Sequence, residues 1–192
     1  MIGVFDASML VLLLNDKAAS PAEPQTGEPV SLVQERIRFM VQQTVKARGR
    51  LIVPTPALGE VLVKVEPESA AEYLSIMERA RGFKISPFGI KAAIEFAEMQ
   101  RQLLGSRSRI KRGDLETRAR AKFDQQIVAI AKAEGASVIY SDDSGLKTYA
   151  KHFGLETLGI RDLPTPPPSD LQQELPLEPP EPEIPTEQEA AR

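Results

Sequence analysis

The sequence contains no cysteine and a single histidine, His152, among its 192 residues. Without cysteine the chain cannot form a disulfide framework, a thiolate metal site or a cysteine nucleophile. The histidine count likewise excludes a metal site built on several imidazoles, and a position near a helix end is sufficient explanation for His152. The absence of cysteine suits a reducing compartment, and we expect a cytoplasmic protein.

Other familiar signals are also missing. The sequence has no glycine-rich phosphate loop of either the dinucleotide or the P-loop kind. The apolar N-terminal run MIGVFDASMLVLLLNDK has no basic leader and carries Asp6 in its interior. Such a run is typical of a buried strand leading into a helix, and not of a signal peptide or a membrane span, so we expect no membrane partner.

Charge is distributed unevenly along the chain. The net charge is −3, but residues 164–192 hold seven acids and one base, a balance of −6, which leaves +3 for residues 1–163. The C-terminal segment is dense in Pro and Glu and has too few apolar residues to offset the entropy of ordering it. We therefore expect a folded domain over residues 1–163 and a disordered, acidic, Pro/Glu-rich tail over residues 164–192.

Short strands and amphipathic helices alternate within residues 1–163. The expected strands are residues 3–5, 50–53, 83–86, 137–140 and 156–158. The expected helices are residues 8–14, 32–47, 68–81, 90–104, 115–134 and 144–153, together with one that starts with Thr55 as its cap and Pro56 at its first position. This alternation predicts an α/β fold with a mostly parallel central sheet and helices on both of its faces.

Five carboxylates fall at the strand–helix junctions or in helices of this framework. They are Asp6, Glu60, Asp124, Asp142 and Asp143. In an α/β sheet such junctions gather along one edge, outside the carboxyl ends of the strands, where ligands bind. Unpaired acids in one pocket raise each other's pKa, and a hard divalent cation held by oxygen ligands is the commonest reason for such a cluster. The sequence therefore predicts a metal site.

Each acid also has an ordinary structural explanation when it is taken alone. The alternatives are a helix-cap role for Asp6, pairing with Lys64 for Glu60, pairing with Arg120 or Lys122 for Asp124, and the helix start at Ser144 for Asp142 and Asp143. The joint placement of the acids favours the metal site over these separate explanations.

Three segments that carry these acids resemble the PIN-domain nucleases, and in particular the VapC-type ribonuclease toxins. The segments are VFDAS, PALGEVL and DQQIVAIAKAEGASVIYSDD, and the likeness extends over about residues 1–160. The resemblance implies a three-layer α/β/α sandwich with a central parallel sheet. It also implies Mg²⁺- or Mn²⁺-dependent cleavage of RNA phosphodiesters.

By this resemblance the acids acquire specific roles. Asp6, Glu60, Asp124 and Asp142 match the acidic quartet, Asp143 is a fifth candidate metal ligand, and Ser8 supplies a hydroxyl that orders Asp6. For a VapC-type toxin the family further implies a small antitoxin protein as partner, and homodimers are common among its members. We expect an endoribonuclease whose partners are RNA and such an antitoxin.

A basic segment precedes Asp124 and is the expected RNA-binding surface. It carries Arg107, Arg109, Lys111 and Arg112 within SRSRIKRGD. These cations could guide a phosphate backbone toward the acids. Aromatic residues are only 5% of the chain, so we expect contacts to the backbone rather than stacking on bases. The alternative function is a PIN-like module without catalysis, which binds RNA or protein through this segment and the acidic tail.

Overall fold

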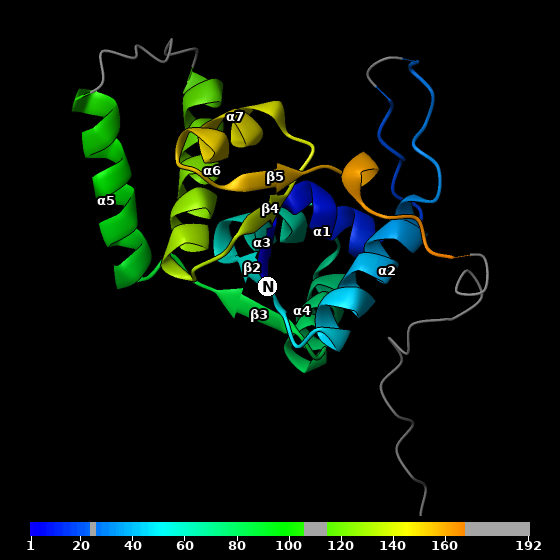
Figure 1. Ribbon diagram of the computed structural model, residues 1–192. Coiled ribbons are helices and arrows are strands. Elements are labelled where there is room, and N and C mark those ends of the chain that lie inside the picture. Colours follow the sequence, from blue (N-terminus) through cyan, green and yellow to red (C-terminus); the bar gives the residue numbers. More distant parts are fainter. Residues whose placement is uncertain (24–25, 106–114, 168–192) are drawn as a thin grey trace, which may run out of the picture.

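The computed structural model describes residues 1–23, 26–105 and 115–167 (Figure 1). Within these residues five strands form one sheet in the order β3-β2-β1-β4-β5, and every neighbouring pair is parallel. The strands are β1 (Ile2–Phe5), β2 (Arg50–Pro54), β3 (Phe83–Ser86), β4 (Val138–Tyr140) and β5 (Glu156–Leu158). The predicted α/β fold with a parallel sheet is confirmed.

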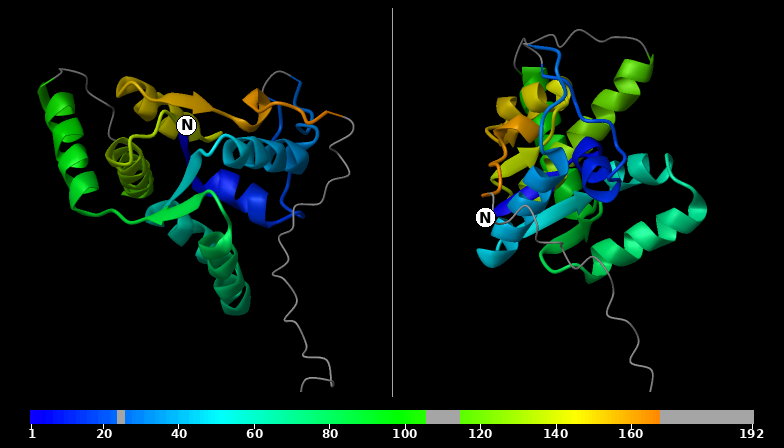
Figure 2. Two further views of the ribbon diagram at one scale, coloured as in Figure 1. Left: turned by 60° about the horizontal axis from the view of Figure 1, so that its bottom comes forward. Right: turned by 90° about the vertical axis from the view of Figure 1, so that its right-hand side faces the viewer.

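Seven α-helices connect the strands in the described part of the chain. They are α1 (Ala7–Leu14), α2 (Val33–Lys46), α3 (Thr55–Leu62), α4 (Pro67–Arg79), α5 (Ile90–Gly105), α6 (Leu115–Ala133) and α7 (Ser144–His152), and the short 3₁₀ helix η1 (Ile160–Asp162) follows β5. Figures 1 and 2 show α5, α6 and α7 grouped on one side of the sheet and α2 and α4 on the other. The result is the expected α/β/α sandwich.

The elements begin and end close to the predicted positions, with one error in how a helix starts. Thr55 was expected to cap α3, but Thr55 is the first helical residue and Pro54 occupies the N-cap position without a side-chain hydrogen bond. Pro54 has an extended backbone and can complete β2, because its missing N–H is not needed there. The strand therefore passes directly into the helix, with no loop between them.

Central strand β1 packs closely against β4 in the core. Phe5 is fully buried, and its ring meets the ring of Tyr140 on β4 edge to face at a centroid separation of 5.5 Å. A β-carbon at Gly3 would lie 2.5 Å from Tyr140 Cε2, so only glycine leaves room for the tyrosine ring there. This close contact fixes β1 against β4, the pair whose ends carry Asp6 and Asp142.

Among the described residues, no helix is both long enough and apolar enough to cross a membrane. The long N-terminal apolar run is divided between β1 and α1, both of which belong to the core.

Candidate active site

An acidic pocket of about 410 Å³ opens at the carboxyl ends of β1 and β4. These two strands lie where the strand order reverses direction, since β2 and β3 extend from one side of β1 and β4 and β5 from the other. Clefts at such a switch point are the usual ligand sites of α/β sheets. The charged and hydroxyl side chains that line the pocket are Asp6, Ser8, Glu60, Lys64, Asp124, Asp142 and Asp143.

Asp6 is the most enclosed of these side chains, with 4% of its surface exposed. Its carboxylate accepts hydrogen bonds from the Ser8 hydroxyl at 2.8 and 2.9 Å, from the Met9 backbone N–H at 2.8 Å, and from the Ser141 hydroxyl. Burial raises the pKa of the Asp6 carboxyl above its ordinary value, and the charge of Asp142 acts in the same direction, while the three donors oppose the rise. Asp6 therefore caps α1 and also faces the pocket.

Asp142 follows β4, and its carboxylate is held by the segment that follows β5. The Ile160 backbone N–H is 3.3 Å from each of its carboxylate oxygens, and Lys147 Nζ on α7 is 3.6 Å from Oδ1. A β-carbon on Gly159 would overlap Asp142 Oδ1 and would lie 2.8 Å from Lys147 Nζ. Glycine at position 159 is what allows Asp142 to reach the Ile160 amide.

Asp143 and Asp124 stand on either side of Gly145 in the first turn of α7. Asp143 caps this helix, because its Oδ1 accepts a hydrogen bond from the Leu146 backbone N–H at 2.9 Å. A β-carbon on Gly145 would lie 3.0 Å from Asp143 Oδ1 and 3.6 Å from Asp124 Oδ2. The carboxylate of Asp124, from α6, therefore lies close to the start of α7.

Glu60 reaches the pocket from α3 and is half-buried. Its expected alternative partner, Lys64, also lines the pocket, but no ion pair joins the two side chains among the described residues. Helix α3 contacts both α1, which Asp6 caps, and α6, which carries Asp124. The structure therefore brings all five predicted acids to one cavity.

The donor set of this pocket suits a hard divalent cation. Five carboxylates line the pocket against one lysine, Lys64, and oxygen ligands are those that Mg²⁺ and Mn²⁺ prefer. The carboxylates do not converge on one point: across residues 1–23, 26–105 and 115–167, no three acidic or histidine side chains are spaced to hold a common ion. A cation held by one or two of these carboxylates together with water would not require three of them to meet.

Three contributors to the site were missed at the sequence level: Ser141, Lys147 and the Ile160 amide. Ser141 directly follows β4, and its position at a strand end was a usable signal. Lys147 lies five residues after Asp142, a spacing that gives no helical pair. The Ile160 contact depends on the pairing of β4 with β5, which the sequence does not reveal.

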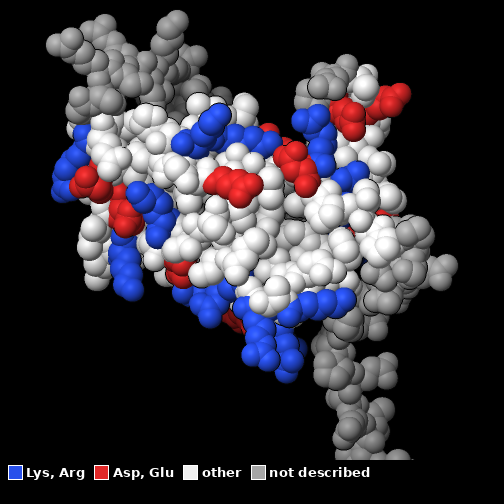
Figure 3. Space-filling model, in the orientation of Figure 1, with Lys and Arg blue, Asp and Glu red and all other residues white. Residues whose placement is uncertain are grey.

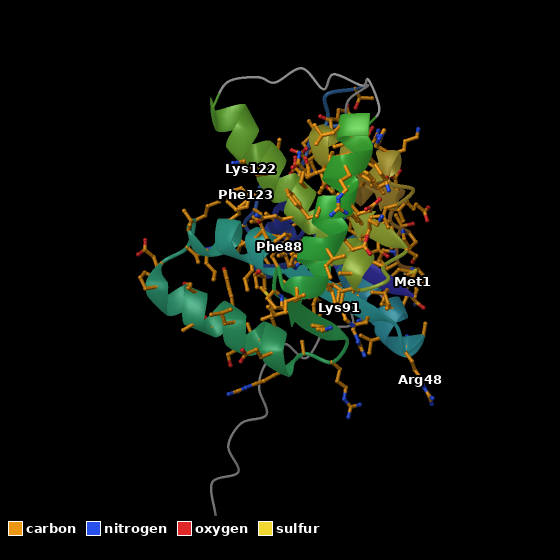
Figure 4. All side chains as sticks on the ribbon, turned by 90° about the vertical axis from the view of Figure 1, so that its left-hand side faces the viewer. Met1, Arg48, Phe88, Lys91, Lys122 and Phe123 are labelled. Carbon is orange, nitrogen blue, oxygen red and sulfur yellow. The ribbon has the colours of Figure 1, made fainter. Side chains whose placement is uncertain are left out.

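The predicted RNA-binding residues Arg107, Arg109, Lys111 and Arg112 lie outside the described residues. Nearby, Lys122 is exposed on α6, two positions before Asp124, and is labelled with its neighbour Phe123 in Figure 4. Residues two positions apart on a helix do not share a face, so this lysine is not assigned to the pocket.

The strand order, the acidic pocket and the sequence agree on one family. A model of the PIN domain matches residues 29–152, and the chain belongs to the PIN domain family. PIN domains are generally nucleases. The matched range includes Glu60, Asp124, Asp142 and Asp143, whereas Asp6 precedes it.

Solved structures of VapBC assemblies share this fold. The chain is similar to VapBC2 from Rickettsia felis bound to a DNA fragment from its promoter, at 15% identity, with 83% of this chain and 98% of that chain covered and a TM-score of 0.54. It is also similar to DNA-bound VapBC from Salmonella typhimurium, at 15% identity, with 83% of this chain and 98% of that chain covered and a TM-score of 0.52. For VapBC-1 from nontypeable Haemophilus influenzae the identity is 12%, the coverage is 84% of this chain and 99% of that chain, and the TM-score is 0.50. A comparison with curated proteins found no match.

Proposed function

We propose that this protein is a divalent-metal-dependent endoribonuclease of the PIN domain family, acting in the cytoplasm. The observation that supports it best is the gathering of Asp6, Glu60, Asp124 and Asp142 in one pocket, although they come from four different segments of the chain. Five carboxylates lie at this pocket, against Lys64 in its lining and Lys147 beside Asp142, and such an excess of negative charge favours a bound cation.

Each acid has a distinct task in this proposal. Asp6, Glu60, Asp124 and Asp142 would hold Mg²⁺ or Mn²⁺, with Asp143 able to offer the oxygen that its cap does not use. A bound ion of this kind supplies a Lewis acid, which lowers the pKa of water and offsets charge on the phosphate. Ser8 and Ser141 orient the Asp6 carboxylate, and the Ile160 amide orients Asp142. Glu60, with no ion pair among the described side chains, would orient the waters of the ion or help to hold a second ion, as would Asp124.

The test is cleavage of RNA by the purified chain with and without Mg²⁺ or Mn²⁺. Asp142→Asn should lower cleavage by about 100-fold or more, because the metal loses a charged ligand. The same variant should lose the rise in melting temperature that the metal gives the unaltered chain. Glu78→Gln changes an exposed acid on α4 and serves as the control. Undiminished cleavage by Asp142→Asn would remove this residue from the reaction.

A specific observation favours a second function, a PIN-like module that binds RNA or protein without catalysis. Asp142 is paired with Lys147, Asp143 caps α7, and no three acids among the described residues are spaced for one ion. Metal titration separates the two functions, because a binding module should gain neither thermal stability nor RNA cleavage from Mg²⁺ or Mn²⁺.

The proposed partners follow from the family and from the named assemblies. We propose that a small antitoxin protein covers the acidic pocket, and that two copies of this chain form a homodimer. RNA is the proposed substrate, and the segment with Arg107, Arg109, Lys111 and Arg112 is its proposed contact surface. Neutralising these four side chains should weaken RNA binding and flatten its salt dependence.

A further inference from the structure

A second cavity, of about 500 Å³, lies between α2 and α4, away from the acids. Its floor is apolar: Leu13, Val41 and Met77 are buried there, and Leu14, Val45, Ile76 and Phe83 are half-buried. The residues that line this cavity come from α1, α2, α4 and the start of β3. We call this cavity the α2–α4 groove.

The rim of the α2–α4 groove is basic. Arg38, Lys46 and Arg81 line it, against a single acid, Asp16. Asp16 is already paired with Arg38 through a contact of 2.7 Å, whereas no ion pair engages Lys46 or Arg81 among the described residues. Both of these side chains are exposed. Figure 3 shows Lys and Arg side chains gathered at the lower edge of the molecule, where α2, β3 and α4 lie in Figure 1. The groove therefore suits an acidic segment with apolar side chains.

The chain's own C-terminal sequence has this composition. Residues 168–192 carry seven acids and one base. Within them, Leu175 and Leu177 are flanked by Glu174 and Glu178 in the run ELPLE, and prolines follow immediately. Proline restricts the unbound backbone, so such a run loses little conformational entropy when it binds as an extended segment.

We propose that the α2–α4 groove binds the C-terminal segment of its own chain, with Leu175 and Leu177 on the apolar floor and Glu174 and Glu178 beside Lys46 and Arg81. The inference does not depend on the proposed nuclease activity.

The last described residues lie at the N-terminal end of α2, from which the C-terminal segment can follow the helix to the groove. Arg36 Nη1 donates to the Leu163 carbonyl at 2.7 Å and to the Arg161 carbonyl at 3.3 Å. From Arg36 to Val45 the helix rises about 14 Å at roughly 1.5 Å per residue. The eight steps along the chain from Pro167 to Leu175 can span about 25 Å in an extended Pro-rich conformation, at about 3.1 Å each. The tether is long enough and keeps the local concentration of the segment high, in the mM range.

The experiment uses the full chain and its lack of cysteine. A nitroxide on Gln173→Cys, the only thiol, should broaden the amide resonances of Val45 and Ala80 in the isotope-labelled protein. Reversing the rim charges with Lys46→Glu and Arg81→Glu should abolish this broadening, and adding Glu174→Lys and Glu178→Lys should restore it. The control pair is Lys91→Glu and Lys122→Glu. These exposed lysines lie on α5 and α6, across the molecule from α2 (Figures 1 and 4), and their reversal should leave the broadening unchanged.

Two results would overturn the proposal. In the first, the groove amides are not broadened, or their broadening survives reversal of Lys46 and Arg81. In the second, broadening arises only between chains, when spin-labelled protein without isotope is mixed with isotope-labelled protein without nitroxide. The groove would then hold the tail of a second copy. Neither readout involves RNA or metal, so failure of the nuclease proposal would leave this test unaffected.

Discussion

Asp6 is a buried carboxylate whose enclosure works against its charge. Burial is the largest influence on its pKa and raises it, although Ser141, Met9 and Ser8 all donate to the carboxylate. A carboxyl whose pKa is higher in the folded than in the unfolded state binds its proton more tightly when folded. The free energy of unfolding therefore falls as pH rises through the raised pKa. At neutral pH the ionised Asp6 costs stability, as many functional residues do.

Replacing Asp6 with asparagine should make the protein more stable at neutral pH while abolishing cleavage. Asparagine keeps the shape and the capping ability at the start of α1, and it removes the buried charge. Thermal melts at neutral and acidic pH measure the effect, and the gain should shrink in acid, where the aspartic acid is protonated. A lower melting temperature for Asp6→Asn at neutral pH would show that the hydrogen bonds outweigh burial.

The Ser141 hydroxyl should set the pH range of the site. Its hydrogen bond lowers the pKa of Asp6, so Ser141→Ala should raise that pKa further and move the acid limb of the pH–activity profile to higher pH. Ser137→Ala is the matched control, because the Ser137 hydroxyl contacts the Ile2 carbonyl at 3.3 Å and not the acids. If the acid limb lay at the same pH in both variants, the Ser141 hydroxyl would have no influence on the ionisation of Asp6.

Sequence reasoning predicts the site acids better than their neighbours, for a physical reason. A carboxylate at the end of a buried strand, such as Asp6 or Asp142, can be placed from local patterns because parallel strands end at one edge. The groups that hold these carboxylates come from register and turn geometry. Ser141 meets Asp6 across the β1–β4 pair, and Ile160 meets Asp142 across β4 and β5. Neither pairing can be read from a single sequence.

At the scale of elements, the turn between β5 and η1 shapes the site as much as the helices do. Gly159 precedes η1, and its own N–H donates to Asp162 Oδ2 at 2.7 Å, while the next N–H is directed to Asp142. Two successive amides thus hold two carboxylates, one structural and one in the acidic pocket.

Gly159→Ala should displace Asp142 and reduce both metal-induced stabilisation and cleavage, by about 10-fold or more, as the loss of an orienting contact to a metal ligand does. The physical reason is the lack of space for a β-carbon beside Asp142 and Lys147. Cleavage assays and melting curves with Mn²⁺ provide the measurement.

The matched control for Gly159→Ala is Gly59→Ala on α3, next to Glu60. A β-carbon there meets nothing within 4 Å, and alanine in place of a helical glycine should stabilise the protein by up to about 1 kcal/mol. Equal activity in Gly159→Ala and Gly59→Ala would mean that Asp142 tolerates the added methyl group.

The element boundaries were predictable because periodicity and caps are local properties. The apolar positions of α2 recur every three or four residues, and the buried residues of the helix are Val33, Ile37, Met40 and Val41 together with Thr44. The start of α3 was misjudged since a Thr-Pro pair usually marks a cap, whereas here the strand runs straight into the helix. Tertiary pairing of β2 with β3 through Pro54 decided that boundary.

At the scale of the whole molecule, buried contacts continue past η1. Leu163 is 2% exposed and Pro166 is also buried, and the Leu163 carbonyl is tied to Arg36. A chain that ends at Pro167 should therefore melt as one cooperative unit. A chain that ends at Asp162 should lose about 2–3 kcal/mol from the Leu163 side chain. At about 2–4 °C per kcal/mol, its melting temperature should fall by roughly 4–12 °C. Equal melting temperatures for the two chains would show that residues 163–167 add no stability to the domain.

Asp6 and Ser141, which are joined by a hydrogen bond beside the acidic pocket, stand 135 positions apart in the chain. A ribosome adding about 5–20 residues per second needs roughly 7–27 s to add that many residues. During this time β1 lacks its neighbour β4, and the first carboxylate has no counterpart from the later strands. Products of synthesis that stop before β4 lack Ser141, Asp142 and Asp143. If the chain has the proposed nuclease activity, we expect such products not to cleave RNA, and the cell would be exposed to the activity only after β4 has been translated.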